Sequence, residues 1–298
     1  MTLQQLRQVL TIAESNSMNE AAKKLFVSQP NLSATVREVE EELGITVFMR
    51  NNRGITVTAE GEEFLGYAKQ VVEQYHLLEN RYLNVESKKK FSVSMQHYSF
   101  AVKAFVQLAK EVGMDEYEFA VHETKTKEVI DNVKNLKSEI GVLYLSDFNE
   151  KVLRKLFKEC DIEFKELFTC NTYVYLWKKH PLAGQKEITL DDLQEYPCLT
   201  FEQGVNNSFY YAEEMMSTYE YKRVIKADDR ATMLNLMVGL NGFTLCSGII
   251  SEDLNGDDYA AIPLKESEIM HIGYIKHKGT KLSKLGEIYI DALSLIHI

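Results

Sequence analysis

The chain has few of the residues that stabilise small secreted domains or bind structural metals. Its 298 residues include four cysteines, four prolines and one tryptophan. The cysteines lie far apart, form no CxxC pair and have no histidine at zinc-finger spacing: Cys160, Cys170, Cys198 and Cys246. We therefore expect neither a disulfide framework nor a metal site, and we expect the thiols to be reduced and mostly buried.

Long apolar runs are also missing from the sequence. No window reaches the roughly 18 consecutive apolar residues of a membrane span, and residues 1–6 place no basic stretch ahead of an apolar run. This pattern predicts a cytoplasmic protein that has no membrane partner. Because 45% of the residues are hydrophobic and 26% are charged, folded domains are expected, and chains of this length usually form more than one.

The short signatures of catalysis are absent as well. The sequence contains no GxSxG turn, no glycine-rich phosphate loop and no HExxH pair. We therefore predict that the protein is not an enzyme, that it has no catalytic residues and that it needs no cofactor. A transport-type binding protein is disfavoured too, because it would need a secretion signal and would have no use for residues 1–90.

Positive charge is scarce overall, since 34 basic side chains face 44 acidic ones and the net charge is −10. The excess is uneven: residues 1–58 hold six of each sign, whereas residues 91–298 hold 23 basic and 32 acidic side chains. Only the local field that faces DNA attracts phosphate groups. The overall acidity therefore lowers non-specific binding to nucleic acid without excluding specific binding.

Three amphipathic helices are predicted near the start of the chain. Apolar residues recur at steps of three and four over residues 3–14, and two further patterns of this kind follow. Asn19 is the predicted cap of the second helix and Ser28 that of the third, which Gly44 ends. Two adjacent alanines let the second helix lie close to the third, and the short connection between them is typical of a helix-turn-helix.

The third predicted helix carries side chains that can pair with base edges or phosphates. They are Ser28, Gln29, Asn31, Ser33, Thr35 and Arg37, with Pro30 near the helix start, where a missing N–H costs nothing. Strands near residues 47–49 and 55–57 flank a basic tip with Arg50 and Arg53, which predicts a β-hairpin wing. Periodicity alone would fit a small helical bundle with a solvated charged loop equally well.

An ordered set of residues resembles the N-terminal signature of LysR-type bacterial transcription regulators. The set runs Ala21-Ala22-x-x-Leu25-x-Val27-Ser28-Gln29-Pro30-x-Leu32-Ser33, then Glu40-x-Glu42-Leu43-Gly44-x-x-x-Phe48-x-Arg50, and ends Thr58-x-x-Gly61. The resemblance implies double-stranded DNA as a partner and a role in transcription. It also implies that Gln29, Pro30 and Ser33 approach bases in the major groove, while Arg50 and Arg53 serve the wing and contact the backbone or minor groove.

The third helix departs from many members of that family in its charge. Ala34 stands where many relatives carry arginine, and the helix is rich in acidic residues: Glu38, Glu40, Glu41 and Glu42. We therefore expect fewer phosphate contacts from this helix.

A heptad pattern follows the predicted wing. Its apolar residues alternate at steps of four and three, and no proline interrupts them: Phe64, Ala68, Val71, Tyr75, Leu78, Tyr82 and Val85. Such a seam favours pairing with a second copy over the core helix of one domain, and LysR relatives use this helix to pair two DNA readers. We expect a dimer or tetramer built from three parts: a winged helix-turn-helix (1–58), a dimerisation helix (59–87) and an effector-binding domain (88–298).

Strands and helices alternate in the rest of the chain. The first predicted series is strand 91–95, helix 100–112, strand 117–122, helix 126–136 and strand 140–145. The second is strand 172–177, a helix capped near Thr189, strand 198–201, a polar helix 208–219, strand 222–227, helix 229–240 and strand 242–246. This alternation indicates parallel sheets covered by helices in two α/β lobes, with a last helix, 283–296, packed on the first lobe.

The LysR resemblance implies that these lobes form a periplasmic-binding-protein-like effector domain. The predicted fold class is therefore α/β with an N-terminal all-α winged helix-turn-helix. Ligands in open α/β sheets gather at the carboxyl ends of strands and at helix N-termini, where free N–H groups favour anions. The residues expected there are Gln96, His97, Tyr98, Ser99, Thr124, Thr126, Thr200, Phe201 and Ser247. We predict a small-molecule effector that is an anionic or polar metabolite.

Each of these residues also has a plainer interpretation. Thr126 is a natural helix cap, and His97 is more often a satisfied polar side chain than a ligand group. A regulator that needs no effector therefore stays open, and so does a thiolate sensor based on Cys198, although no second cysteine lies nearby to resolve it. RNA polymerase is a further candidate partner of a regulator of this type.

Overall fold

The computed structural model describes residues 1–15, 17–51, 54–82, 89–113, 116–206 and 208–295. The chain divides into two compact units, Met1–Ser87 and Lys88–Ile298. Within these described ranges, no helix is both long enough and apolar enough to cross a membrane.

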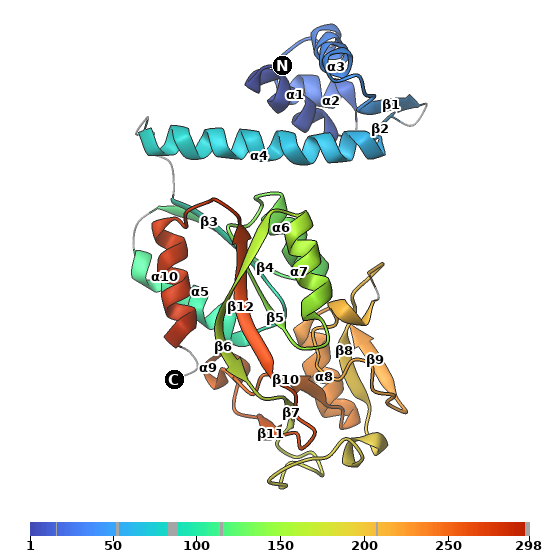
Figure 1. Cartoon of the computed structure of the whole chain (residues 1–298), viewed down its shortest axis with the longest axis vertical. Coiled ribbons are helices and arrows are strands. Elements are labelled where there is room, and N and C mark those ends of the chain that lie inside the picture. Colours follow the sequence, from blue (N-terminus) through green and yellow to red (C-terminus); the bar gives the residue numbers. More distant parts are fainter. Residues whose placement is uncertain (16, 52–53, 83–88, 114–115, 207, 296–298) are drawn as a thin grey trace. The chain divides into compact units, whose positions relative to one another are not determined.

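The first unit combines three short helices, a β-hairpin and one long helix (Figure 1). Its elements are α1 (Leu3–Ala13), α2 (Met18–Lys24), α3 (Gln29–Leu43), β1 (Phe48–Asn51), β2 (Gly54–Val57) and α4 (Ala59–Tyr82). The predicted helices and the predicted antiparallel hairpin are confirmed. Val9, Ile12, Ala21 and Leu32 are fully buried in the core of this unit.

Side chains at the helix ends explain where these helices begin and end. Ser28 caps α3 as predicted, because its hydroxyl accepts a hydrogen bond from a main-chain N–H of the first turn, at 3.4 Å. Gly44 ends α3 in the left-handed conformation, with φ of 71°. The predicted cap of α2 was wrong: Ser17, not Asn19, accepts the first-turn N–H, at 3.2 Å.

Two residues of the signature hold the scaffold together. The carboxylate of Glu40 accepts hydrogen bonds from the N–H groups of Val47, at 2.7 Å, and Phe48, at 3.0 Å, and so joins α3 to the hairpin. Gly61 lies in the first turn of α4, where a Cβ atom would stand 2.4 Å from the carbonyl oxygen of Val47. Both residues therefore fix the hairpin against the helices.

The long helix α4 divides its apolar residues between two faces. Ala68 and Val72 are buried with Leu6 of α1, and Leu65 is buried in the main core of the unit. Because Ala68 is a residue of the predicted seam, part of that seam belongs to the core. A second set, the α4 stripe, is exposed: Tyr67, Val71, Tyr75, Leu77 and Leu78. The side chain of Tyr82 and all of Val85, which we assigned to the seam, lie outside the described residues.

The first lobe of the second unit is a five-stranded sheet covered by helices (Figure 1). Its strands follow the order β4-β3-β5-β12-β6, and its elements are β3 (Lys89–Met95), α5 (Ser99–Val112), β4 (Tyr117–Glu123), α6 (Thr126–Lys134), β5 (Ile140–Leu145), α7 (Glu150–Glu159), β6 (Ile162–Cys170), β12 (Met270–His277) and α10 (Lys284–Leu295).

This sheet is mixed, not parallel as predicted. β3 pairs in parallel with β4 and β5, whereas β12 runs antiparallel to β5 and β6. The predicted packing of the last helix on this lobe is confirmed, because Tyr289 of α10 is fully buried and its hydroxyl donates to the carbonyl of Ala101 in α5, at 3.1 Å.

The second lobe has an antiparallel sheet, β10-β7-β11, and a parallel pair, β8-β9. Its elements are β7 (Tyr173–Trp177), η1 (Asp192–Glu195), β8 (Cys198–Phe201), η2 (Phe209–Tyr211), β9 (Val224–Ala227), α8 (Arg230–Leu240), β10 (Thr244–Cys246), α9 (Glu252–Asn255) and β11 (Tyr259–Pro263). The prediction of two α/β lobes in place of one large sheet is confirmed.

Two predicted helices of this lobe were wrong. Near Thr189 the chain forms only the 3-10 turn η1, and the Thr189 hydroxyl donates to the carboxylate of Asp192, at 2.7 Å. The segment 208–219 contains only the 3-10 turn η2. Its carboxylates Glu213 and Glu214 are buried and bonded to residues outside the segment, which a solvent-facing polar helix would not allow.

Candidate functional site

The outer face of α3 is polar and open. Pro30, Asn31 and Arg37 are exposed. Gln29, Ser33 and Thr35 are partly buried, and the side-chain amide of Gln29 donates to the hydroxyl of Ser33, at 2.7 Å. This bond holds two polar side chains one turn apart on the same face of the helix. Ser28 is exposed, but its hydroxyl caps the helix.

The basic tip of the hairpin is only partly described. The main chain of Arg50 lies in β1, while its side chain and the whole of Arg53 lie outside the described residues.

The acidic residues of α3 are engaged on the side of α1. The amide of Gln5 donates to Glu38, at 2.9 Å, and the N-terminal amino group of Met1 donates to Glu42, at 2.7 Å. Together with the contact of Glu40 to the hairpin, these bonds account for three of the four acidic side chains that set this helix apart.

A shallow groove adjoins the start of α3. It is lined by Asn19, Ala22, Lys23, Phe26, Val27 and Gln29. Phe26 is 96% exposed and has a φ of 53°, so the turn presents an aromatic ring beside Gln29. Sequence reasoning missed this residue, because a single aromatic residue in a turn produces no periodic signal.

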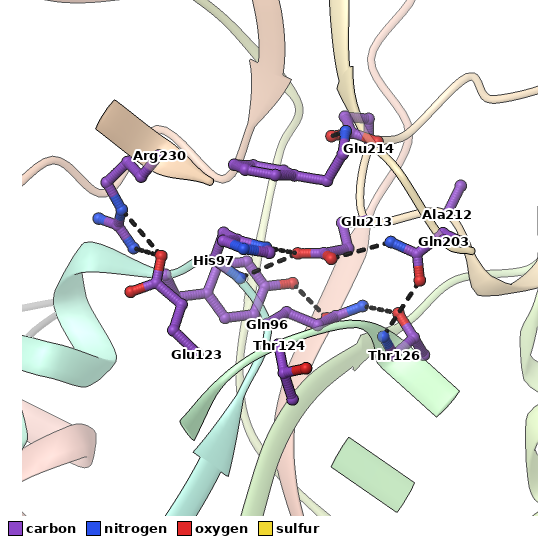
Figure 2. A network of polar contacts seen from close by, with 12 residues as sticks. Gln96, His97, Glu123, Thr124, Thr126, Gln203, Ala212, Glu213, Glu214 and Arg230 are labelled. Atoms are coloured by element: carbon purple, nitrogen blue, oxygen red, sulfur yellow. Dashed lines mark hydrogen bonds and ion pairs between the residues drawn. The ribbon is translucent and has the colours of Figure 1, made fainter. Parts of the chain in front are cut away.

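A continuous network of hydrogen bonds joins the two lobes of the second unit (Figure 2). In the first lobe, the side chain of Gln96 accepts from the Tyr98 hydroxyl, at 2.9 Å, and donates to the Thr126 hydroxyl, at 2.6 Å. Gln96 and Thr126 are each only 1% exposed. Gln96 therefore links the end of β3 to the start of α6.

Gln203 and Glu213 of the second lobe complete this network. The N–H of Thr126 donates to Gln203, at 3.1 Å, and the amide of Gln203 donates to Glu213, at 2.9 Å. The other carboxylate oxygen of Glu213 accepts from the N–H of His97, at 2.9 Å, and lies 2.8 Å from the Nδ1 of His97. Figure 2 shows Glu213 lying between Gln203 and His97. A carboxylate and an amide of the chain itself thus occupy the N–H groups of His97 and Thr126, in the region where we expected an anionic effector.

Glu214 is buried beside Glu213. Its carboxylate accepts from the N–H of Phe201, at 2.8 Å, and its main-chain carbonyl accepts from the Tyr144 hydroxyl, at 3.4 Å. Burial, reinforced by the neighbouring Glu213 carboxylate, raises the pKa of Glu214 to about 8. Glu214 is therefore largely protonated at neutral pH.

Two ion pairs also cross between the lobes. The guanidinium of Arg230 donates twice to one oxygen of Glu123, at 3.0 and 2.8 Å. Lys125 lies 3.4 Å from Asp228. Both pairs are accessible to solvent, so they align the lobes more than they stabilise them.

A cavity lies beside the network. Apolar side chains of both lobes form most of its wall, among them Phe100, Met233, Leu245 and Ile250. Polar side chains gather in another part of the lining: His97, Glu213, Glu214 and Arg230. A mostly apolar pocket with a few convergent polar groups is the usual form of a small-molecule site.

The predicted effector residues fall into three groups. Five of them line the cavity: His97, Tyr98, Ser99, Phe201 and Ser247. Gln96 and Thr126 belong to the network instead. Thr124 lies between β4 and α6, and its hydroxyl donates to Glu128 of α6, while Thr200 lies within β8. These two are not among the described residues that line the cavity.

Sequence reasoning missed several residues of this site: Tyr175, Gln203, Glu213, Glu214 and Arg230. The one signal that could have found the glutamates is their adjacency within 208–219, where the apolar residues do not follow a helical spacing.

The four cysteines are free; Cys160 and Cys198 are buried, while Cys170 and Cys246 are partly buried. Burial raises the pKa of Cys170 to about 11 and of Cys246 to about 12, and it also raises those of Cys160 and Cys198. A redox-sensing thiol needs a lowered pKa and access to solvent. None of the four, all of which lie in described ranges, has these properties.

Two family models match the chain. Residues 3–62 match a bacterial regulatory helix-turn-helix protein of the lysR family, and residues 114–294 match a LysR substrate binding domain. The second match alone covers more than half of the chain.

Known proteins resemble the chain over most of its length. It is 28% identical over 214 residues to the transcriptional regulator CysL of Bacillus subtilis (strain 168), which covers 69% of this chain and 66% of CysL. Its fold resembles a full-length OxyR variant from Pseudomonas aeruginosa, with a TM-score of 0.70 at 19% identity over 99% of this chain and 95% of that one. It also resembles CbnR in complex with its target DNA, with a TM-score of 0.61 at 17% identity over 99% and 100% of the two chains.

Proposed function

The chain belongs to the LysR family of bacterial regulators. We propose that it controls transcription by reading one DNA sequence with α3. We also propose that its second unit senses one small molecule. The polar outer face of α3 is the observation that supports the proposed reading of DNA. Its polar side chains stand on a helix whose opposite face is fixed by Leu32, Val36 and Val39, all buried.

The proposed reading residues are those expected from the sequence: Ser28, Gln29, Pro30, Asn31, Ser33, Thr35 and Arg37, with Arg50 and Arg53 from the wing. Gln29 is the strongest of them, because glutamine pairs with adenine through two hydrogen bonds in the major groove. Its bond to Ser33 orients the amide before DNA arrives, which lowers the entropy lost on binding.

The α4 stripe is the proposed contact between copies of the chain. Tyr67, Val71, Leu77 and Leu78 are each more than half exposed, and such a row of large apolar side chains on one helix is stabilised by a partner. Two α3 helices held in this way would read two halves of an inverted repeat.

The cavity of the second unit is the proposed effector site. His97, Tyr98, Ser99, Phe201 and Ser247 line it, while Gln96 and Thr126 hold the lobes around it. An effector changes transcription only if it binds one arrangement of the protein more tightly than another. The hydrogen bonds between the lobes would give the cleft two such arrangements, one with the bonds made and one with them broken.

We also propose that the protein acts in the cytoplasm and has no catalytic activity. A regulator must reach the chromosome, and regulation of transcription makes RNA polymerase a natural further partner. Neither Thr124 nor Thr200 is retained as an effector residue, since their side chains do not line the cavity.

Selection of duplexes from a random DNA library by the full-length chain would test the proposal. We expect enrichment of one sequence with two-fold symmetry, bound roughly a thousandfold or more tighter than random duplex. A Glu41→Ala variant, changed at an exposed residue of α3 to which we assign no contact, is the control and should enrich the same sequence. Failure to enrich any sequence would contradict the proposal.

A further inference from the structure

We infer that the cavity of the second unit binds an organic ammonium ion with an apolar body, with Glu214 and Glu213 as its counter-ions. The inference rests on the proposed function and deepens it, because it names the chemistry of the effector. It replaces the anionic effector that we expected from the sequence.

The charges that line the cavity favour a cation. Arg230 is the one permanently positive side chain among its described lining residues, and its guanidinium donates two hydrogen bonds to Glu123, at 3.0 and 2.8 Å. His97 lies against Glu213, with 2.8 Å between Nδ1 and the carboxylate. Among these residues a carboxylate ligand would therefore meet two buried glutamates and no free cation, which is strongly unfavourable away from water.

Two main-chain donors near helix starts are already used by the chain. The N–H of Thr126, at the start of α6, is bonded to Gln203, and the N–H of His97, just before α5, is bonded to Glu213. The anionic effector that we expected depended on donors at Ser99, Thr124 and Thr126 near helix starts. At the N–H groups of Thr126 and His97 an incoming anion would have to displace a buried amide or carboxylate that is already bonded.

The apolar wall defines the other end of the ligand. Phe100, Phe201, Met233, Leu245 and Ile250 bring aromatic and aliphatic surfaces from both lobes to the cavity. Burial of apolar surface provides most of the affinity of small-molecule sites, while a few polar groups fix orientation. The ligand should therefore carry a ring or a branched chain beside its charged group.

Tyr175 supplies a further sign that a ligand belongs here. The residue is 9% exposed and lines the cavity, and its hydroxyl has no hydrogen-bond partner of ordinary length and angle among the described residues. Nearby Asn255 acts to lower the pKa of this hydroxyl, but burial outweighs it and raises that pKa to about 12. A buried hydroxyl without a partner is rare in folded proteins, and a polar group on the ligand would satisfy it.

Binding should be coupled to loss of a proton. Because burial raises the pKa of Glu214, this residue carries a proton in the empty cavity at neutral pH, and a neighbouring ammonium ion favours its carboxylate form. The other titratable groups around Glu214 are Glu213, Tyr98, Tyr144, Cys198 and Tyr221. The tyrosines and the cysteine have raised pKa values and stay neutral, so they do not supply the proton. We assign it to Glu214, and loss of proton release in Glu214→Gln separates this residue from His97, which lies against Glu213.

Calorimetry on the full-length chain with three probes of matched shape tests this inference: phenethylamine, phenethyl alcohol and phenylacetate. We expect phenethylamine to bind roughly tenfold or more tightly than the alcohol, and phenylacetate to bind least. Titration in two buffers of different ionisation enthalpy should show proton release with the amine alone. Equal or tighter binding of phenylacetate would overturn the inference, and so would a failure of all three probes to bind.

A pair of variants assigns the preference to Glu214. Glu214→Gln should lose most of the preference for the amine over the alcohol, because the remaining Glu213 already faces His97. Glu187→Gln, at an exposed position, should keep the wild-type preference. An unchanged preference in Glu214→Gln would overturn the role of this residue. The selectivity of the wild type tests the inference even if that variant fails to fold. DNA binding by the same preparations separates the two proposals, because intact DNA binding with the wrong selectivity contradicts only this inference.

Discussion

The outer face of α3 and the cleft between the lobes both carry rows of polar side chains, yet only the first leaves most of them open. On α3, Asn31 and Arg37 are exposed, and the Gln29–Ser33 bond stays within the face. In the cleft, Glu213 and Gln203 from one lobe are bonded to the main chain of the other.

The difference between these two regions shows when an N–H donor near a helix start can bind an anion. Such a donor attracts an anion only where no acceptor of the chain has taken it. At the start of α6 the acceptor comes from a residue 77 positions away, and just before α5 it comes from one 116 positions away. The cleft is therefore closed by its own side chains, and its remaining space is the cavity beside them.

The largest expected effect is on the oligomeric state, at the α4 stripe. This stripe is a third surface to compare with the outer face of α3 and the cleft. Changing both Val71 and Leu78 to glutamate places charge within an apolar contact, where it is strongly unfavourable without a partner. We expect the double variant to sediment as a monomer. Val205→Glu, which changes a 98% exposed apolar residue of the second unit in the same way, should keep the oligomer. A double variant of wild-type size would show that α4 is not the contact.

The buried carboxylate of the cleft should make stability depend on pH. The pKa of Glu214 is raised to about 8 in the folded chain, so its contribution to stability is full below its unfolded pKa and is lost as the pH rises through 8. The free energy of unfolding of the wild type should therefore fall between pH 5 and 8, relative to Glu214→Gln, by on the order of a few kcal/mol.

Urea unfolding of both proteins across this range measures the difference. All other titratable groups are shared by both proteins, so the comparison isolates the contribution of Glu214. A parallel pH dependence of the two would show that Glu214 is ionised throughout.

A smaller effect on stability is expected at Glu40, whose carboxylate joins α3 to the hairpin. Glu40→Ala removes the acceptor of two main-chain N–H groups at the base of the hairpin and should destabilise the first unit by about 1–3 kcal/mol. Glu41→Ala removes an exposed carboxylate of the same helix and should change stability very little. Equal melting temperatures of the two variants would remove the structural role given to Glu40.

The first unit was largely predictable because its signals are local. The apolar spacing of α3, its cap at Ser28 and its end at Gly44 all lie within one short stretch of sequence. The cap of α2 was misplaced because Ser17 and Asn19 are both good capping residues, and only the structure shows which one accepts the bond.

The cleft was only partly predictable because its contacts are distant in sequence. β12 joins the first sheet from the far end of the chain, and no local pattern told us which strand it would pair with. His97 and Ser99 line the cavity as predicted, because ligand sites in α/β folds lie at the carboxyl ends of strands and β3 ends just before these residues. The partners of His97 and Thr126 are Glu213 and Gln203, and we had predicted a polar helix over 208–219, where Glu213 lies.

The most direct test of the account is the affinity of full-length variants for the selected duplex and for a random one, measured over a range of salt concentrations. Gln29→Ala should lose about 1–3 kcal/mol on the selected duplex and nothing on the random one. Arg53→Ala, at the wing, should weaken both and lower the salt dependence. Equal losses on both duplexes for both variants would contradict the claim that α3 reads the sequence.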